Sequence, residues 1–567
     1  MSSYPNTMPP TRPEVADHTV ADKRPRWVQL ATSADHKVIS MIMMTVAFGS
    51  LFLAAVELVL IRLQLAVPEN VFLTAITYDR LLSVYGATAI FLFALPLCFA
   101  LLYYVVPLQI GTRSTALPRL GQTGLWLFLL GGFVLYASFL FTPPEAGINP
   151  LPPLSEITFT SNNGIDAWIV STGMVTLGLL MIAIDLLVTV RHLRAPGMAW
   201  RRAPFFVWTA AIVSWLFVVI APVFLAAVTM LFIDRQAGGG FFGGGVGGAP
   251  LLWQHLSYIF LTGAYMTIAI TFLGAISEIV QNFTNRELPG RRVIVGSLAA
   301  IAVIGTLAWA QNMITAPIPV GFKYFAMLLS ISLIVPFGLI FWNLISAVSS
   351  ADFNMRAPLR YAMGALSLAS IGLIVEVSQS TIAIGSQLQQ TYDAWAATHF
   401  TLIGFAVFGG FAAISYWYPK ITGRELNEDR ARISFLVMFA GTIIALVPLF
   451  AAGVEGQVTD SYRFFSSDGV SAFNLIASIG TLVLFLGLIM AIGNLIVSRN
   501  EGAMATPDPW HGDSLEWLAL SPPPAHNFDV LPDVRSTRPM RDIRESLSQD
   551  PPAIEEESPA GETQPVA

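Results

Sequence analysis

Twelve long apolar stretches run through the sequence, and they constrain the fold more than any other feature. A helix that crosses the hydrocarbon core of a bilayer needs about 20 predominantly apolar residues. Stretches of this length occupy residues 38–62, 81–107, 119–142, 165–190, 206–233, 251–280, 292–314, 322–349, 359–386, 393–418, 432–452 and 471–498. Backbone groups within lipid must be paired inside the segment, so each stretch is predicted to be a helix. The predicted fold class is an all-α integral membrane protein with twelve transmembrane helices.

Composition agrees with this prediction and excludes several other classes of protein. Of the 567 residues, 54% are apolar and 12% are charged, whereas about a quarter of a typical soluble domain is charged. The single cysteine, Cys98, excludes an intrachain disulfide and a cysteine-based metal site. The net charge of −6 lies in loops and an acidic tail and does not favour nucleic-acid binding. Residues 1–26 lack the apolar core of a signal peptide, so the first helix is expected to direct its own insertion.

Basic residues are distributed unevenly among the connections, and this predicts the orientation of the chain. Every second connection is rich in arginine or lysine, whereas the alternate connections contain few basic residues. The basic connections contain Arg113 and Arg119; Arg191, Arg194, Arg201 and Arg202; Arg286, Arg291 and Arg292; Arg356 and Arg360; and Lys420, Arg424, Arg430 and Arg432. With an even number of helices, both termini are expected on the cytoplasmic side of a bacterial-type inner membrane.

The predicted organisation has three parts. Residues 1–32 form a cytoplasmic N-terminal tail, residues 33–499 form the twelve-helix membrane domain, and residues 500–567 form a cytoplasmic C-terminal tail. Proline, serine and acidic residues are abundant in the last part, and disorder is expected from about residue 535. The glycine-rich stretch 238–248 is interpreted as an outer connection, because it lacks the Lys-Ser/Thr ending of a phosphate-binding loop.

Several motifs follow one another in a fixed order. They are PLQIGTRSTALPRL at residues 107–120, LAAVTMLFIDR at 225–235, LLWQHL at 251–256 and DPWHGDSLEW at 508–517. Together they resemble subunit I of the haem-copper oxidases, in the branch with mitochondrial-type enzymes. The resemblance covers about residues 33–530 and implies a haem-copper oxidase subunit I-like bundle. It also implies partners in the lipid bilayer, namely other membrane subunits such as a subunit II-like or cytochrome protein, and no nucleic acid.

The resemblance implies six intramembrane histidines, of which three ligate two haems and three hold a copper ion; imidazole suits both metals. This chain has seven histidines, and only His255 and His399 lie within the apolar stretches. On the family pattern, His399 and Tyr85 occupy the two low-spin haem ligand positions. Thr262, Gln311 and Asn312 replace the copper ligands, and Ala397 replaces the high-spin haem ligand. His399 and Tyr85 are therefore the candidate residues of a residual low-spin haem pocket, and no metal site or catalytic residue is expected.

Ionisable side chains inside the apolar stretches suggest a different function. Such groups are costly in lipid and often mark a path for protons or ions. The candidates are Glu57, Asp185, Glu278, Lys323 and Glu376. They are scattered along the chain, and the alternative is that each lies near a helix end or has a structural partner.

The favoured hypothesis is a degenerate, non-catalytic relative of the oxidase subunit that acts as a scaffold or anchor in a membrane complex. It predicts no cofactor, or at most one haem, and no enzymatic activity. One alternative is a haem-binding electron-transfer or terminal oxidase subunit, for cytochrome c oxidation and oxygen reduction, with unusual ligands. The other is a channel or transporter that uses the remodelled pores. Haem and metal analysis distinguishes the first two hypotheses.

Overall fold

The computed structural model describes residues 25–549 except 148, 244–246, 350–354, 530 and 532. This part of the chain contains helices and turns and no extended strand. Twelve of its helical spans are long and apolar enough to cross a membrane. They are His36–Gln64, Ala75–Gln109, Pro118–Leu140, Gly164–His192, Phe205–Ala237, Pro250–Phe283, Arg291–Met313, Val320–Ser349, Ala357–Gln379, Tyr392–Thr422, Glu428–Val454 and Ser471–Glu501. Each predicted stretch overlaps one span, so the predicted fold class is confirmed.

Most spans are built on a single helix, and three are composite. The single helices are α2 (His36–Gln64), α5 (Pro118–Ala137), α6 (Gly164–His192), α7 (Phe205–Ala237), α8 (Pro250–Phe283), α9 (Arg291–Leu307, followed by the short helix η5, Trp309–Met313), α12 (Ala357–Gln379), α16 (Glu428–Val454) and α17 (Ser471–Glu501). The composite spans are α3 (Ala75–Ala87), η1 (Thr88–Ala94) and α4 (Leu95–Gln109); α10 (Val320–Ser332) and α11 (Ile334–Ser349); and α14 (Tyr392–Leu402), η6 (Ile403–Gly409) and α15 (Gly410–Thr422). Shorter helices include α1 (Arg26–Thr32), α13 (Ile382–Leu388), η3 (Trp200–Arg202) and α18 (Pro539–Gln549).

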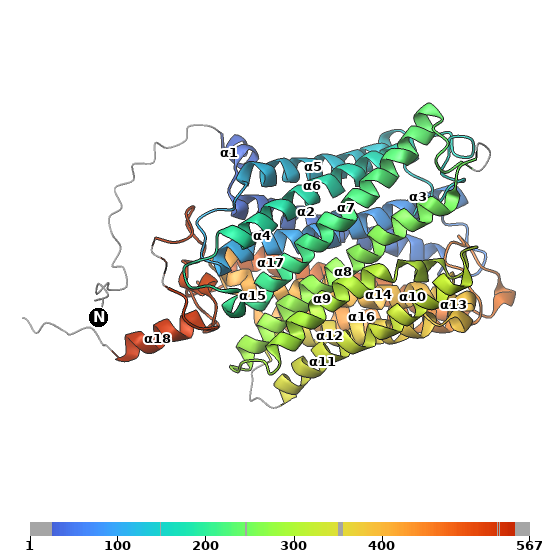
Figure 1. Cartoon of the computed structure of the whole chain (residues 1–567). Helices are drawn as coiled ribbons and strands as arrows, with labels where there is room; N and C mark the ends of the chain where they lie inside the picture. Colours follow the sequence, from blue (N-terminus) through green and yellow to red (C-terminus); the bar gives the residue numbers. More distant parts are fainter. Residues whose placement is uncertain are drawn as a thin grey trace, which may run out of the picture.

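The helices lie side by side in one bundle, as Figure 1 shows. Three spans form its centre: Ala75–Gln109 is 94% buried over its most apolar part, and Pro250–Phe283 and Tyr392–Thr422 are each 78% buried. The other spans expose more of their surface, as expected of helices that face lipid on one side. Tyr85, Thr262 and His399 each lie on one of the three central spans, so the fold itself places the predicted site in the middle of the bundle.

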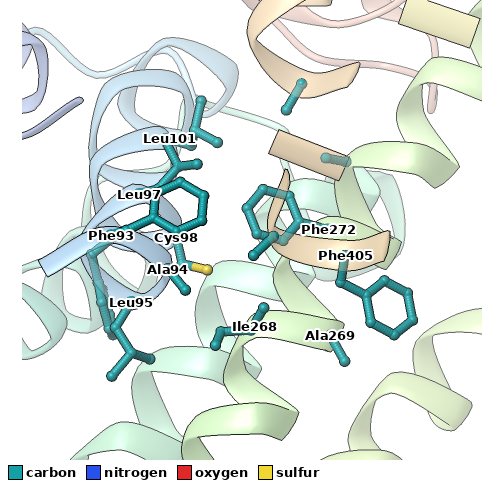
Figure 2. Packing of buried hydrophobic residues seen from close by; sticks show 14 of the residues in the cluster. Phe93, Ala94, Leu95, Leu97, Cys98, Leu101, Ile268, Ala269, Phe272 and Phe405 are labelled. Carbon is teal, nitrogen blue, oxygen red and sulfur yellow. The ribbon is translucent and has the colours of Figure 1, made fainter. Parts of the chain in front are cut away.

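The core next to the site is a close packing of apolar side chains from these three spans (Figure 2). Phe93, Cys98, Phe272 and Phe405 are all buried there. Gly409 allows this approach, because a Cβ atom on it would lie 2.8 Å from the Cβ of Phe272. Lipid tails are as apolar as these side chains, so van der Waals packing between helices, rather than transfer from water, stabilises this centre.

The C-terminal segment packs on the end of the bundle that also carries α1 (Figure 1). The Lys37 ammonium donates to Asn527 Oδ1 at 2.8 Å and to the Ala525 carbonyl at 3.1 Å, and the Asn527 amide donates to the Thr112 carbonyl at 2.8 Å. Helix α18 forms in a stretch for which composition had indicated disorder. The division into a membrane domain and two tails stays a prediction, and residues 1–24 and 550–567 lie outside the described part.

Candidate functional site

Tyr85 and His399 contact each other inside the bundle. The Tyr85 hydroxyl is 2.8 Å from His399 Nε2, and the two buried rings are inclined by only 11°, with centroids 6.0 Å apart. Tyr85 lies shortly before the π-helical segment η1, and His399 lies shortly before the π-helical segment η6. Such segments are rare in proteins and frequently occur at functional sites. The structure therefore brings together the two residues that the sequence predicted as a pair.

Trp395 orients the imidazole of His399. The backbone carbonyl oxygen of Trp395 lies 2.7 Å from His399 Nδ1, and its indole ring stacks on the imidazole with centroids 3.4 Å apart. Because the carbonyl accepts the Nδ1 proton, Nε2 is the unprotonated nitrogen and accepts the hydrogen bond of the Tyr85 hydroxyl. Histidines that ligate metals commonly have this arrangement. Sequence reasoning missed Trp395, although its position four residues before His399 on one helix was a usable signal.

A cavity of about 800 Å³ adjoins the pair. This volume lies within the range of about 300–1,000 Å³ that is usual for ligand and cofactor sites. Its walls come from α8, η5, α11, α12 and α14, together with Tyr85 of α3. The polar side chains that line it include Thr262, Tyr265, Gln311, Asn312, Glu376 and Gln389. The remaining lining is mainly apolar and aromatic, so the cavity offers a few polar groups in a low-dielectric setting.

The three residues expected at copper-ligand positions all line this cavity. The Asn312 side-chain amide donates to the Thr262 hydroxyl at 3.1 Å, and Gln311 donates to the Glu376 carbonyl at 3.4 Å. Gln389 in turn donates to the Gln311 carbonyl at 2.8 Å. Thr262, Gln311 and Asn312 therefore line one cavity, and these groups bond to one another or to the backbone. Ala397, by contrast, is fully buried on α14 and does not line the cavity.

The cavity reaches the membrane-facing surface between α11 and α12. Ile334 on α11 and Ile374 on α12 both line it and are 53% and 71% exposed. Helix α11 packs mainly against α9 and α8 and has few contacts with α12, the next long helix in the chain. Both helices belong to candidate membrane spans.

A second cavity next to the pair is much smaller, about 90 Å³, and almost wholly apolar. It lies among α2, η1, η6 and α17, and Tyr85 and His399 line it as well as the larger cavity. The pair therefore separates two spaces in the bundle. The smaller one is lined mainly by apolar side chains.

The other histidine and the ionisable side chains have local partners. The Trp309 indole donates to His255 Nδ1 at 3.1 Å, in keeping with a structural role for this histidine. The partners of the charged groups are Tyr136 for Glu57, Tyr103 and the Leu117 amide for Asp185, the Phe206 amide for Glu278 and the Ile314 carbonyl for Lys323. Glu376 lines the large cavity. The hydrogen bonds of the described residues do not link these five side chains directly to one another.

Comparison with known proteins decides the family. The family model described as "Cytochrome C and Quinol oxidase polypeptide I" matches residues 38–483. The chain belongs to this family. It is 33% identical over 530 residues to cytochrome c oxidase subunit 1 of Bacillus subtilis (strain 168), a match that covers 92% of this chain and 85% of the relative. It is 32% identical over 537 residues to cytochrome c oxidase subunit 1 of Corynebacterium efficiens, covering 94% of this chain and 91% of the relative.

Two further matches extend this result for the oxidase subunit I-like chain. Heme-copper oxidase subunit I+III of Aeropyrum pernix is 32% identical, over 90% of this chain and 62% of that protein. A chain in the cryo-EM structure of a heme-copper terminal oxidase dimer is similar in fold, with a TM-score of 0.66, 13% identity and 84% of each chain covered. The mitochondrial-type branch and the orientation in a bacterial inner membrane stay predictions.

The expectation of no cofactor, or of at most one haem, is wrong. It is overturned by membership of a family whose relatives are named cytochrome c oxidase subunit 1 and heme-copper oxidase subunit I+III. The physical weakness of that expectation is that it counted imidazoles alone. Haem iron is also held in proteins by tyrosinate, thiolate and thioether ligands, so a low histidine count does not exclude a haem.

The residues present fit a haem better than they fit a copper ion. For haem, His399 offers an imidazole whose Nδ1 is already bonded to a carbonyl, beside a cavity of sufficient size. For copper, Thr262, Gln311 and Asn312 offer a hydroxyl and two amides, whereas copper in such sites is held by imidazole. Within the described residues, no group of three or more His, Cys, Asp or Glu side chains is placed to hold a metal ion. These three positions therefore do not fit the copper ion.

Proposed function

We propose that this chain is a haem-binding subunit of an oxidase-type membrane complex and that it takes part in electron transfer. The observation that carries this proposal is His399, which is buried, held by the Trp395 carbonyl through Nδ1, and placed beside an 800 Å³ cavity, with Tyr85 as the side chain that bonds to its unprotonated Nε2. The haem would supply one-electron redox chemistry when bound.

The chain's own residues would hold and shield this group. His399 would hold the haem iron, and Trp395 would keep its imidazole in the required tautomer and orientation. The buried aromatic and aliphatic walls would exclude water, which lowers the local dielectric constant around the ligand. Tyr85 would have to release His399 Nε2, since its hydroxyl now occupies the direction of that lone pair.

A second candidate function is a scaffold subunit that does not reduce oxygen. The hydrogen bond between Asn312 and Thr262 favours it, because two of the three copper-ligand positions have groups that satisfy each other. In this case the chain would anchor a subunit II-like or cytochrome partner in a bacterial-type inner membrane, with both termini on the cytoplasmic side. Both candidates assign the chain to a complex with other membrane subunits.

The experiment is a reduced-minus-oxidised spectrum and a metal assay on the protein purified from its native membrane. We expect haem in the wild type and in His255→Phe, the matched control, and its loss from His399→Phe. Equal haem content in all three proteins would refute His399 as the ligand, and its absence from the wild type would refute the first candidate. Oxygen uptake with reduced cytochrome c then tests the second candidate, which predicts none.

A further inference from the structure

A basic cavity of about 300 Å³ lies where α6 ends and the chain turns toward η3. Arg191, His192 and Arg194 line it, together with Ala195, Gly197, Met198 and Ala199. No carboxylate lines the cavity, and among the described residues neither arginine takes part in an ion pair. The cavity therefore has a surplus of positive charge that the described part of the chain does not neutralise.

The loop that forms this cavity is held in place from two sides. The Ala195 amide donates to the Ile110 carbonyl at 2.8 Å, and the Val534 amide donates to the Pro196 carbonyl at 3.1 Å. Arg202 ties these elements together by donating to the carbonyls of Gly197 at 2.9 Å and Val534 at 3.0 Å. The loop is thus held in place by hydrogen bonds to two other parts of the chain.

The contacts of Arg194 are the evidence for a ligand at this cavity. Its guanidinium lies 4.3 Å from the centre of the Trp200 ring, which fixes it by a cation–π contact. Its Nη1 is buried and has no hydrogen-bond partner among the described residues. Buried N–H groups are nearly always paired, and a guanidinium pairs best with carboxylate or phosphate oxygens. Burial and the charge of Arg191 lower the pKa of Arg194, which a bound anion would counteract.

The position of the cavity at the end of a membrane span suits a lipid headgroup. It lies at the end of the membrane span Gly164–His192, next to Trp200 and Trp208, whose rings are 4.7 Å apart. Tryptophan is enriched at the boundary between hydrocarbon and headgroups. On the lipid-facing side of α7, Trp215 and Val219 are each 61% exposed and could accompany an acyl chain. The negative end of the α6 dipole explains why basic residues lie in its last turn. It explains neither the cavity nor the unpaired Nη1 of Arg194.

We propose that this cavity binds the phosphate group of an anionic phospholipid, with Arg194 and Arg191 as the principal contacts. A bound lipid would fasten the C-terminal segment near Val534 to the membrane surface, because that segment forms part of the wall support. The same chemistry could come from free phosphate in solution, but the position at the end of a membrane span favours the lipid. This inference is independent of the haem proposal.

The test is native mass spectrometry of the purified protein titrated with dioleoyl phosphatidylglycerol, dioleoyl phosphatidylcholine or inorganic phosphate. One arginine near a membrane surface contributes roughly fivefold to the affinity for an anionic lipid, so Arg194→Gln should bind phosphatidylglycerol roughly fivefold more weakly and the double variant with Arg191→Gln roughly 25-fold. Arg201→Gln is the matched control, an exposed arginine of the same connection that does not line the cavity.

Unchanged binding in the Arg201 variant supports the site, and an equal loss there would overturn it in favour of diffuse surface charge. Equal affinity for phosphatidylcholine would also overturn it. If inorganic phosphate displaces phosphatidylglycerol at millimolar concentration, the phosphate site stands and the lipid source is refuted. Arg191→Gln alone, at an exposed position, provides the test if the Arg194 variant does not fold.

Discussion

The ion pair between Arg235 and Asp166 should control the stability of the outer loop that precedes α6. The Arg235 guanidinium is fully buried and bonds both carboxylate oxygens of Asp166, at 2.8 and 3.0 Å. It also donates to three loop carbonyls, those of Ser155, Thr160 and Asn162. The same loop contributes Asn149 to the wall of the 800 Å³ cavity, so loosening it would expose the candidate site.

Asp166→Asn should weaken this loop by about 3 kcal/mol. Removing one partner of a buried ion pair costs about 3–5 kcal/mol, because the other charge stays buried without compensation. The lower value applies here, since the asparagine oxygen still accepts one hydrogen bond and Asp166 is 14% exposed. A tenfold change in an equilibrium corresponds to about 1.4 kcal/mol, so local opening of the loop should become roughly 100-fold more frequent.

Hydrogen–deuterium exchange measures this opening directly. The amides of Ser155, Glu156 and Thr160 are hydrogen-bonded within the loop and should exchange roughly 100-fold faster in the variant. The control is Glu501→Gln, which breaks the exposed pair with Arg430, whose side chains are 67% and 49% exposed, and should change exchange little. Unchanged exchange at the three loop amides, or acceleration spread evenly over all helices, would refute the reasoning.

Two further predictions concern the centre of the bundle and its C-terminal cover. Tyr85→Phe should bind haem roughly tenfold more tightly in a titration of the haem-free protein, because haem no longer has to break the 2.8 Å hydrogen bond between Tyr85 and His399. Weaker binding would mean that the Tyr85 hydroxyl itself holds the iron. Burial raises the pKa of Glu516, so the folded state retains this proton to higher pH than the unfolded chain. The contribution of protonated Glu516 to the free energy of unfolding is therefore present at low pH and is lost as pH rises above about 4.3, by up to about 1.4 kcal/mol per pH unit. Glu516→Gln should make the thermal stability less dependent on pH between about pH 5 and pH 8.

The helices were predictable from the sequence, because spanning a bilayer imposes a length and an apolar composition that few other structures share. The proximity of Thr262 and Asn312 could also be expected, because the resemblance to the oxidase subunit puts both residues at copper-ligand positions. Two features were not predictable in this way. The π-helical segments η1 and η6 depend on packing between spans rather than on local composition. The cofactor expectation failed because a count of imidazoles says nothing about other ligand types.

Haem binding at His399, as proposed above, would require a change of conformation. The Tyr85 hydroxyl lies 2.8 Å from His399 Nε2, and a lone pair that accepts this hydrogen bond cannot also bind iron. His399 would therefore need a second state in which Tyr85 has released Nε2, and a ligand would shift the population toward it only by its preference for that state. The Trp395 carbonyl holds Nδ1 on the far side of the ring from this contact, so the imidazole need not turn when the tyrosine leaves. The movement that haem binding requires thus falls on Tyr85 and the start of η1, beside the cavity into which that side chain can withdraw.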